Sequence, residues 1–593
     1  MNKLMRLLSK DDKRKIAILF MMMIAAAVFE TIGIGMIVPF VGIVTNPEMI
    51  QQQKILSYLF NLFSFKSAEA FLIFAVIFLL LVFLIKNLYL LLFQYAQNRV
   101  ILNQQVKLSK RLFNEYLTKP YTFHLERNSA TLLRNLNVEV SKVFQGIIMA
   151  GFNLLTEALV ISSILVLLLI TAPEATITAT VLLGGSVLIF FKYFRKKITK
   201  LGKEQREVSA SLIKWVNQGL GASKEVKVLG KEAFFVEAYT KQNQIKANNS
   251  MYMKMLDHVP RLFIETLVVT IVLIVMMIII FAGTETEKVV STMALFAMAA
   301  FRIMPSINRV VSLITAMKYN QPALSVVYDD LFMNVDSNRQ RVISNVKPPI
   351  NGERVYKNEI KLNAISFKYP NQKEYAIKDV SLTIPIGKSV AFIGESGAGK
   401  TTIVDIILGL FKPEKGRILV DGIDLHEQKQ TWQRKIGYIP QTIYLSDDTI
   451  RGNVAFCIEE TQIDDKQVWR ALEQAQLKEF VESLPEQLNT TVGERGVRLS
   501  GGQRQRIGIA RALYNDPEIL FMDEATSALD NDTETEIMKA IDGLRGEKTL
   551  IIIAHRLSTI ENCDIVYKIT NGNLLSINNK LEQTSHRKIK GLG

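Results

Sequence analysis

The sequence predicts a helical membrane domain with six spans, followed by an α/β domain built around a P-loop. Three observations carry this prediction. Apolar runs long enough to cross a hydrocarbon core, which takes about 20 helical residues, all lie before about residue 320. Residues 394–401 read GESGAGKT, a complete G-x-x-x-x-G-K-[ST] motif. Around this motif, short strand-like runs alternate with helical ones, which is typical of a parallel sheet covered by helices.

The chain has 593 residues, which is too long for one ordinary core, so we expect separate domains. The membrane domain is expected over residues 1–336 and the nucleotide-binding domain over residues 354–580. Residues 337–353 contain proline and glycine among polar residues, which indicates a linker. The polar and basic tail 581–593 is expected to be disordered.

The predicted spans are separated by segments of clear charge bias. Lysine and arginine crowd residues 3–15, 99–142 and 192–254, and the positive-inside rule places these segments in the cytoplasm. This distribution explains the net charge of +15 better than nucleic-acid binding does. An even number of spans returns the chain to the side where ATP is found, so we expect a multi-pass protein of the cytoplasmic (inner) membrane. The spans cover about residues 16–44, 70–95, 144–170, 174–192, 258–283 and 289–318.

Two long polar segments between spans are expected to be cytoplasmic extensions of the membrane helices, because loops of that length rarely lack structure. Turns at Lys119–Phe123, where Pro120 ends a helix, and at Leu220–Gly230 are expected to contact the nucleotide-binding domain. Ordinary helix turns are the alternative. Residues 45–69 carry apolar residues at helical spacing, which predicts a short external helix that lies in the membrane interface or packs against the spans.

Four apolar runs predict the parallel strands of the second domain: Val390–Ile393, Ile436–Ile439, Ile519–Met522 and Thr549–Ile553. The P-loop follows the first run, and its glycines let successive backbone N–H groups surround phosphate oxygens. Lys400 supplies a positive charge and Thr401 a magnesium ligand. The residues expected to bind ATP here are Gly394, Glu395, Ser396, Gly397, Ala398, Gly399, Lys400, Thr401 and Thr402.

Two adjacent carboxylates end the third of these runs. Asp523 is expected to hold Mg²⁺ beside the P-loop, usually through a water molecule. Glu524 is the candidate base that orients or deprotonates the attacking water. A surface Asp-Glu pair at a strand end is the alternative, and the following residues 525–530, Ala-Thr-Ser-Ala-Leu-Asp, argue against it.

Residues 499–503 read LSGGQ, a second glycine-rich motif. In this order and spacing, the P-loop and LSGGQ resemble the ATP-binding cassette family. The resemblance implies that Ser500, Gly501, Gly502 and Gln503 cap the γ-phosphate of ATP held by a second chain. Because this chain carries one membrane half and one cassette, it must then pair. A homodimer is the simplest assembly, and a heterodimer with another half-transporter stays open.

The same resemblance assigns further roles. Gln441 matches the Q-loop residue that touches Mg²⁺, and His555 matches the histidine that contacts the γ-phosphate. Tyr369 matches the aromatic residue that stacks on adenine, with Phe367 as the competing residue. Residues 493–496, Gly-Glu-Arg-Gly, resemble the X-loop of exporters. This implies an ATP-hydrolysing, domain-swapped exporter dimer of the type IV fold.

Charged residues inside the predicted spans indicate the cargo, because a charge at membrane depth normally faces a cavity or a partner. Arg302 and Arg309 lie seven residues apart, which places them two turns apart on one helix face. With Arg261 and Lys86, they are expected to form a ladder for an anionic head group such as pyrophosphate. Interhelical pairing or snorkelling is the alternative, particularly for Lys86.

This charge pattern, the span layout and the external segment are similar to PglK-type lipid-linked oligosaccharide flippases, which implies a polyprenyl-pyrophosphate glycan as the substrate. A multidrug, lipid or peptide exporter is the main alternative. Its pocket would be dominated by apolar and aromatic groups, and its arginines would be mutually paired. A non-transporting, ATP-gated regulator or channel is a third reading. The presence of Glu524 and His555 argues against that reading.

Overall fold

The computed structural model describes residues 10–45, 47–171, 173–281, 286–332, 356–523, 531–554, 560 and 562–579. The predicted linker 337–353 and tail 581–593 lie outside these residues. The chain forms two compact units. The first contains residues 1–119 and 127–342, and the second contains residues 120–126 and 343–593.

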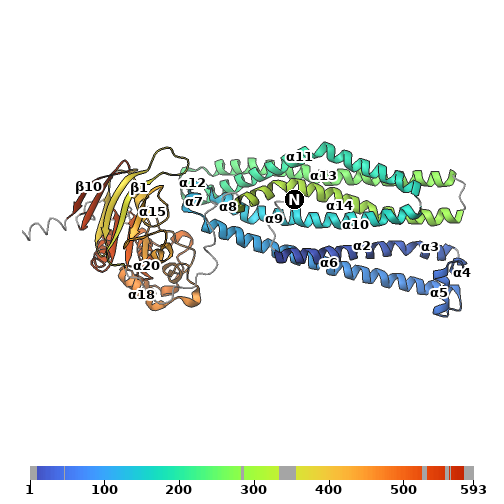
Figure 1. Cartoon of the computed structure of the whole chain (residues 1–593), viewed down its shortest axis with the longest axis horizontal. Coiled ribbons are helices and arrows are strands. Elements are labelled where there is room, and N and C mark those ends of the chain that lie inside the picture. Colours follow the sequence, from blue (N-terminus) through green and yellow to red (C-terminus); the bar gives the residue numbers. More distant parts are fainter. Residues whose placement is uncertain are drawn as a thin grey trace, which may run out of the picture. The chain divides into compact units, whose positions relative to one another are not determined.

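The first unit is entirely helical over the described residues (Figure 1). Each of the six predicted spans lies in one or two of its helices. The longest helix, α6, has 51 residues and is therefore about 75 Å long, more than twice the thickness of a hydrocarbon core. The helices are α2 (Lys10–Gly35), α3 (Ile37–Thr45), α4 (Met49–Gln52), α5 (Lys54–Leu62), α6 (Ala68–Thr118), α8 (Ser129–Arg134), η1 (Asn135–Glu139), α9 (Val140–Val143), η2 (Phe144–Met149), α10 (Ala150–Thr171), α11 (Pro173–Gly221), α12 (Ser223–Leu229), α13 (Glu232–Phe281) and α14 (Thr286–Phe332).

Three described helical stretches are long and apolar enough to cross a membrane: Arg14–Gly33, Ala68–Thr118 and Ser129–Ile170. The first predicted span is not one continuous helix, because it breaks at Met36 between α2 and α3. Pro39 explains this local break, since it has no N–H to donate to the carbonyl four residues earlier.

Close helix contacts hold the first unit together around α14. A Cβ atom on Gly202 of α11 would lie 2.1 Å from the carbonyl oxygen of Tyr319, and one on Gly146 of η2 would lie 2.3 Å from Asn320 Nδ2. Nearby, Asp330 accepts hydrogen bonds from Tyr116 Oη (2.5 Å) and from Asn135 Nδ2 (2.9 Å). The end of α14 is thus tied to α6 and η1 by buried polar groups.

The predicted external helix is α5. Its residues Leu56 and Leu59 pack against Ile43, Ile50 and Phe71, while its opposite face exposes other apolar side chains. The prediction of a helix in residues 45–69 is therefore confirmed, and one face of that helix packs on the neighbouring spans.

Both predicted turns are present. Helix α6 ends at Thr118, and Lys119 adopts an extended backbone (φ −60°, ψ 152°), as expected for a residue before proline. The following short helix α7 (Tyr121–Glu126) belongs to the second unit, with the nucleotide-binding domain. Helix α12 ends at Gly230, which takes a left-handed conformation (φ 60°). Contact of α12 with a nucleotide-binding domain stays a prediction.

The second unit contains two sheets. The larger has the order β10-β9-β3-β8-β7-β6, in which all neighbours are parallel except the β10-β9 pair. The smaller is antiparallel, with the order β2-β1-β4-β5, and the sequence reasoning did not predict it. The strands are β1 (Glu359–Phe367), β2 (Ile377–Pro385), β3 (Ser389–Ile393), β4 (Lys415–Val420), β5 (Ile423–Asp424), β6 (Ile436–Ile439), β7 (Ile519–Asp523), β8 (Thr549–Ile553), β9 (Ile565–Thr570) and β10 (Asn573–Asn579).

The four predicted strands are confirmed within one residue at each end, as β3, β6, β7 and β8. Alternate residues of β7 enter different cores. Ile519 and Phe521 pack with α15 and the antiparallel sheet, whereas Leu520 and Met522 pack with α18 and α20. The helices are α15 (Lys400–Ile407), α16 (Lys429–Arg434), α17 (Ile450–Val454), α18 (Asp465–Gln474), α19 (Lys478–Glu482), α20 (Gly501–Leu513) and α21 (Asn531–Asp542), with short 3₁₀ turns η3 (Glu460–Gln462), η4 (Gln487–Asn489) and η5 (Glu494–Gly496).

Candidate functional site

The P-loop connects β3 to α15, as the sequence predicts. Gly394, Gly397 and Gly399 all have positive φ angles, of 150°, 81° and 105°. A Cβ atom on Gly394 would lie 2.2 Å from the carbonyl oxygen of Ile569, so glycine is required there by space as well as by conformation. The loop is therefore a tightly packed turn whose backbone N–H groups are available to an anion.

Lys400 begins α15 and is 5% exposed. Its Nζ donates hydrogen bonds of 2.9 Å to the carbonyl oxygens of Gly394 and Glu395. The ammonium group is therefore held inside the loop, at the place where phosphate oxygens are expected.

Tyr369 follows β1 and lies beside the P-loop helix. Its hydroxyl is 2.9 Å from Thr402 Oγ1, and burial raises the pKa of this hydroxyl, which keeps it neutral. Phe367, the competing residue for adenine stacking, is 5% exposed, and its ring stacks on Phe411. This geometry favours Tyr369 as the residue that stacks on adenine, because the Phe367 ring is buried in the core against Phe411.

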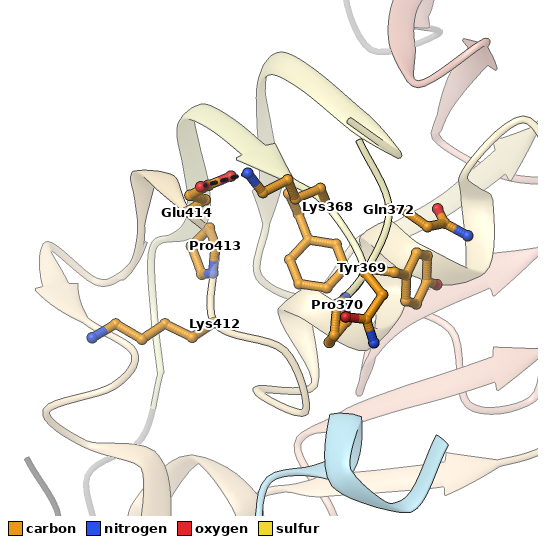
Figure 2. A pocket seen from close by; sticks show the side chains of 9 residues that line it. Lys368, Tyr369, Pro370, Gln372, Lys412, Pro413 and Glu414 are labelled. Atoms are coloured by element: carbon orange, nitrogen blue, oxygen red, sulfur yellow. Dashed lines mark ion pairs between the residues drawn. The ribbon is translucent and has the colours of Figure 1, made fainter. Parts of the chain in front are cut away.

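A pocket of about 340 Å³ lies beside Tyr369 (Figure 2). It is lined by residues 367–372 on one side and by residues 412–414 on the other. Lys368 and Glu414 form an ion pair of 3.2 Å across it. The pocket is therefore bordered by the predicted adenine residue, and its lining contains none of the P-loop residues 394–401.

Asp523 ends β7 and is 9% exposed, beside a second carboxylate that the sequence reasoning missed. This is Asp405 of α15, whose pKa is raised to about 7 by burial and by the charge of Asp523. Its only sequence signal is a lone carboxylate in the apolar run 403–407. The two carboxylates lie close enough to interact electrostatically, and their oxygens are ligands of the kind that a magnesium ion prefers.

The LSGGQ motif forms the start of α20. Ser500 Oγ accepts a hydrogen bond of 3.2 Å from the Gln503 N–H, and Gln503 Oε1 accepts one of 2.8 Å from the Ser500 N–H. This capping box fixes the first turn and leaves the N–H groups of Gly501 and Gly502 at the helix start. Ser500 and Gly501 are exposed, so this end of the helix is accessible to an anion.

Of the remaining predicted residues of the ATP site, the structure describes Gln441 but not Glu524 or His555. Gln441 follows β6 and is exposed. Glu524 and His555 lie outside the described residues. The strands that precede them are described, since Asp523 at the end of β7 pairs with Ile553 at the end of β8. The sequence positions of Glu524 and His555 therefore follow neighbouring strand ends.

Of the charged residues predicted for the cargo site, two form ion pairs and one is exposed to solvent. Lys86 forms a buried ion pair with Glu30 at 3.3 Å. Arg309 Nε lies 2.5 Å from Glu157 Oε1, with its side chain 48% exposed. Arg261 of α13 is exposed, whereas the side chain of Arg302 is not among the described ones. For Lys86, the geometry favours the alternative interpretation, an interhelical pair.

Comparison with known proteins identifies the family. The family described as ABC transporter matches residues 377–527, and the family described as ABC transporter transmembrane region matches residues 32–304. The ATP-dependent lipid A-core flippase of Saccharophagus degradans is 31% identical to this chain over 499 residues, which is 82% of this chain and 80% of that protein. The chain belongs to the ABC transporter family.

Another similar protein is the ATP-dependent lipid A-core flippase of Cupriavidus pinatubonensis, with 30% identity over 483 residues, 80% of this chain and 78% of that protein. A solved structure of a bacterial Atm1-family ABC exporter with ATP bound has the same fold, with a TM-score of 0.77. It is 21% identical, and the match covers 97% of this chain and 96% of that one.

These findings confirm the predicted class. This ABC transporter is a half-transporter of the type IV exporter fold, with a helical membrane domain and an ATP-binding domain. It couples ATP hydrolysis to transport. It is a multi-pass protein of the inner membrane, with its ATP-binding domain in the cytoplasm.

Proposed function

We propose that this ABC transporter uses ATP to flip an anionic lipid-linked oligosaccharide, a polyprenyl-pyrophosphate glycan, to the outer face of the inner membrane. The observation that carries the proposal is the half-exposed guanidinium of Arg309 on α14. Arg309 already pairs with Glu157, but its guanidinium stays half exposed, and a pyrophosphate in a transport cavity is the kind of second anion that such a group binds. The names of the lipid A-core flippases support a lipid cargo in general.

Arg309 has room for a second anion in addition to Glu157. Its contacts use Nε and Nη2: Nε and Nη2 approach Glu157, and Nη2 lies 3.4 Å from Ser306 Oγ. Nη1 makes none of these contacts. The side chain of Glu157 is only 12% exposed, whereas that of Arg309 is 48% exposed, so the head group meets the guanidinium on the side away from Glu157.

The ladder then consists of Arg309, Arg302 and Arg261. Arg302 is one of two arginines on α14, about 10 Å along the axis from Arg309. Arg261 is exposed on α13, a helix that packs on α14. Lys86 could bind the cargo only if its buried ion pair with Glu30 opened. We therefore propose that Lys86 joins α6 to α2 and does not bind the head group.

An exporter of drugs, peptides or other lipids is the second candidate. The two ion pairs Lys86–Glu30 and Arg309–Glu157 favour it, because arginines that only neutralise neighbouring carboxylates do not bind a cargo. The two candidates therefore differ in the role of Arg309.

The test uses proteoliposomes that contain a polyprenyl-pyrophosphate glycan, with ATP-dependent protection of the glycan from an external enzyme as the measurement. Arg309→Ala should reduce flipping at least tenfold, because one hydrogen bond to a charged group contributes about 1.5–3 kcal/mol. Glu157→Gln is the matched control, since it removes the pair and keeps the arginine. Equal losses in both variants would refute anion binding by Arg309 and support the second candidate.

We also propose how ATP is used. Lys400 and the P-loop bind the phosphates, and Tyr369 stacks on adenine. Thr401, Gln441 and Asp523 would hold Mg²⁺, which would neutralise phosphate charge. Two further residues, Glu524 and His555, act on the attacking water and the γ-phosphate. A Glu524→Gln variant that binds ATP but does not hydrolyse it would support this assignment, and wild-type hydrolysis would contradict it.

In this proposal, two copies of the chain share each ATP site, so LSGGQ acts on the partner's ATP. Mixed dimers test this directly. A chain with Lys400→Ala paired with a chain with Ser500→Arg should keep one intact site and trap about one vanadate-stabilised nucleotide per dimer. A chain carrying both changes, paired with the wild-type chain, should trap none. The reverse result would show that LSGGQ serves the P-loop of its own chain.

A further inference from the structure

The short helix α7 makes two contacts close to Tyr369, one with Phe411 and one with Asn371. At its start, the ring centroid of Tyr121 lies 5.8 Å from that of Phe411. At its end, Glu126 Oε1 accepts a hydrogen bond of 2.7 Å from Asn371 Nδ2. All these residues belong to the second compact unit. The pale blue helical turn beside the pocket in Figure 2 is this segment.

The first contact reaches Tyr369 through a cluster of rings. Phe411 is 1% exposed and stacks on Phe367, with centroids 4.9 Å apart and ring planes at 14°. Tyr369 meets both rings nearly at right angles, at 78° and 5.2 Å from Phe367 and at 83° and 5.6 Å from Phe411. Because such pairs are directional, the plane of the Tyr369 ring depends on the position of Phe411.

The second contact holds the backbone after Tyr369. Residues 369–372 form a turn in which the Gln372 N–H donates to the Tyr369 carbonyl at 3.1 Å. Asn371 occupies the left-handed region there (φ 65°), and its side chain reaches Glu126. The hydrogen bond from Asn371 to Glu126 therefore ties this turn to α7.

We propose that α7 is a clamp that positions Tyr369 for the base of ATP, with Tyr121, Phe411, Asn371 and Glu126 as its positioning residues. The proposal rests on the proposed role of Tyr369 in adenine stacking.

The test measures KM and kcat of ATP hydrolysis for the full-length transporter in nanodiscs, with ATP and with CTP. Tyr121→Ala should raise KM for ATP about threefold, or about 0.7 kcal/mol at 1.4 kcal/mol per tenfold, with kcat unchanged. KM for CTP should change less, because a pyrimidine has less surface to stack. Tyr121→Phe keeps the ring and should behave as the wild type.

Asn371→Gly tests the second contact at an exposed position, since glycine keeps the left-handed backbone and removes the amide. It should also raise KM for ATP. The double variant Tyr121→Ala, Tyr369→Ala should have the same KM as Tyr369→Ala alone, because the clamp acts only through Tyr369.

Three results would overturn the clamp, and they can be distinguished from one another. A raised KM in Tyr369→Ala with a wild-type KM in Tyr121→Ala and Asn371→Gly would overturn the clamp alone. A wild-type KM in Tyr369→Ala would overturn the role of Tyr369 in base binding and the clamp with it. A loss of kcat without a change in KM in Tyr121→Ala would also contradict the clamp.

Discussion

The ion pair between Lys86 and Glu30 gives a quantitative prediction for the membrane domain. It joins α6 to α2 at a distance of 3.3 Å, and the two residues are only 8% and 7% exposed. The Phe83 ring centroid lies 4.6 Å from Lys86 Nζ, and a Cβ on Gly33 would lie 3.3 Å from Lys86 Cδ, so the site is closely packed. Lys86→Met would remove the lysine's positive charge from beside the buried Glu30 carboxylate.

Removing one member of a buried pair costs about 3–5 kcal/mol of the free energy of unfolding. For a domain of this size, that corresponds to a decrease in Tm of roughly 6–10 °C. The double variant Lys86→Met, Glu30→Gln removes both charges and should recover at least half of the loss. Lys110→Met, at an exposed position of the same helix, should change stability by less than about 0.5 kcal/mol.

Thermal unfolding in detergent, followed by tryptophan fluorescence, measures these differences, and glycan flipping is measured in parallel. A Tm within 1 °C of the wild type for Lys86→Met would refute a structural pair. Recovery of Tm in the double variant without recovery of flipping would instead return Lys86 to the cargo site.

Two further predictions concern a close helix contact in the membrane domain and an ion pair in the nucleotide-binding domain. Gly202→Ala should lower the free energy of unfolding by about 1–3 kcal/mol, because its Cβ would lie 2.1 Å from the carbonyl oxygen of Tyr319. Gly221→Ala, with nothing within 4 Å of its Cβ, should leave the free energy of unfolding unchanged. Equal Tm values for the two variants would contradict the close contact. The hydrogen bond from Lys548 (2.6 Å) lowers the pKa of Asp516 below its usual value of about 3.9, so its stabilisation is present above that pH and is lost as the pH falls through the lower, folded-state pKa. Asp516→Asn should therefore lower the free energy of unfolding by less than about 1 kcal/mol at pH 7, since the carboxylate is half exposed, and this difference should shrink steadily as the pH falls below about 3.9. A difference that does not shrink with falling pH would contradict this.

The parts of the fold that depend on local sequence were predictable. The strand before the P-loop and the strand ending in Asp523 are continuous apolar runs, and both are confirmed. Pro120 predicted the end of α6 for a local reason, its missing N–H. The antiparallel sheet was missed, because bulges at Ala364 and Asp379, both with positive φ, interrupt the alternation of buried and exposed residues.

The parts of the site that depend on tertiary contacts were not predictable in the same way. Lys86 and Glu30 are 56 residues apart, so their pairing depends on the register between two helices, which leaves no local pattern. Asp405 gives only a weak signal in the sequence, and its proximity to Asp523 follows from the placement of α15 beside β7. The contact of Glu126 with Asn371 spans 245 residues and has no sequence signature.

The central claim is that the transporter selects an anionic lipid head group through the arginines of its membrane domain. The most direct test compares ATP-dependent flipping of two lipids that share the same polyprenyl chain and glycan, one joined by pyrophosphate and the other by a neutral linker. The account predicts that only the pyrophosphate lipid is flipped by the wild type, and that Arg309→Ala removes this preference. Equal flipping of both lipids by the wild type would contradict the account.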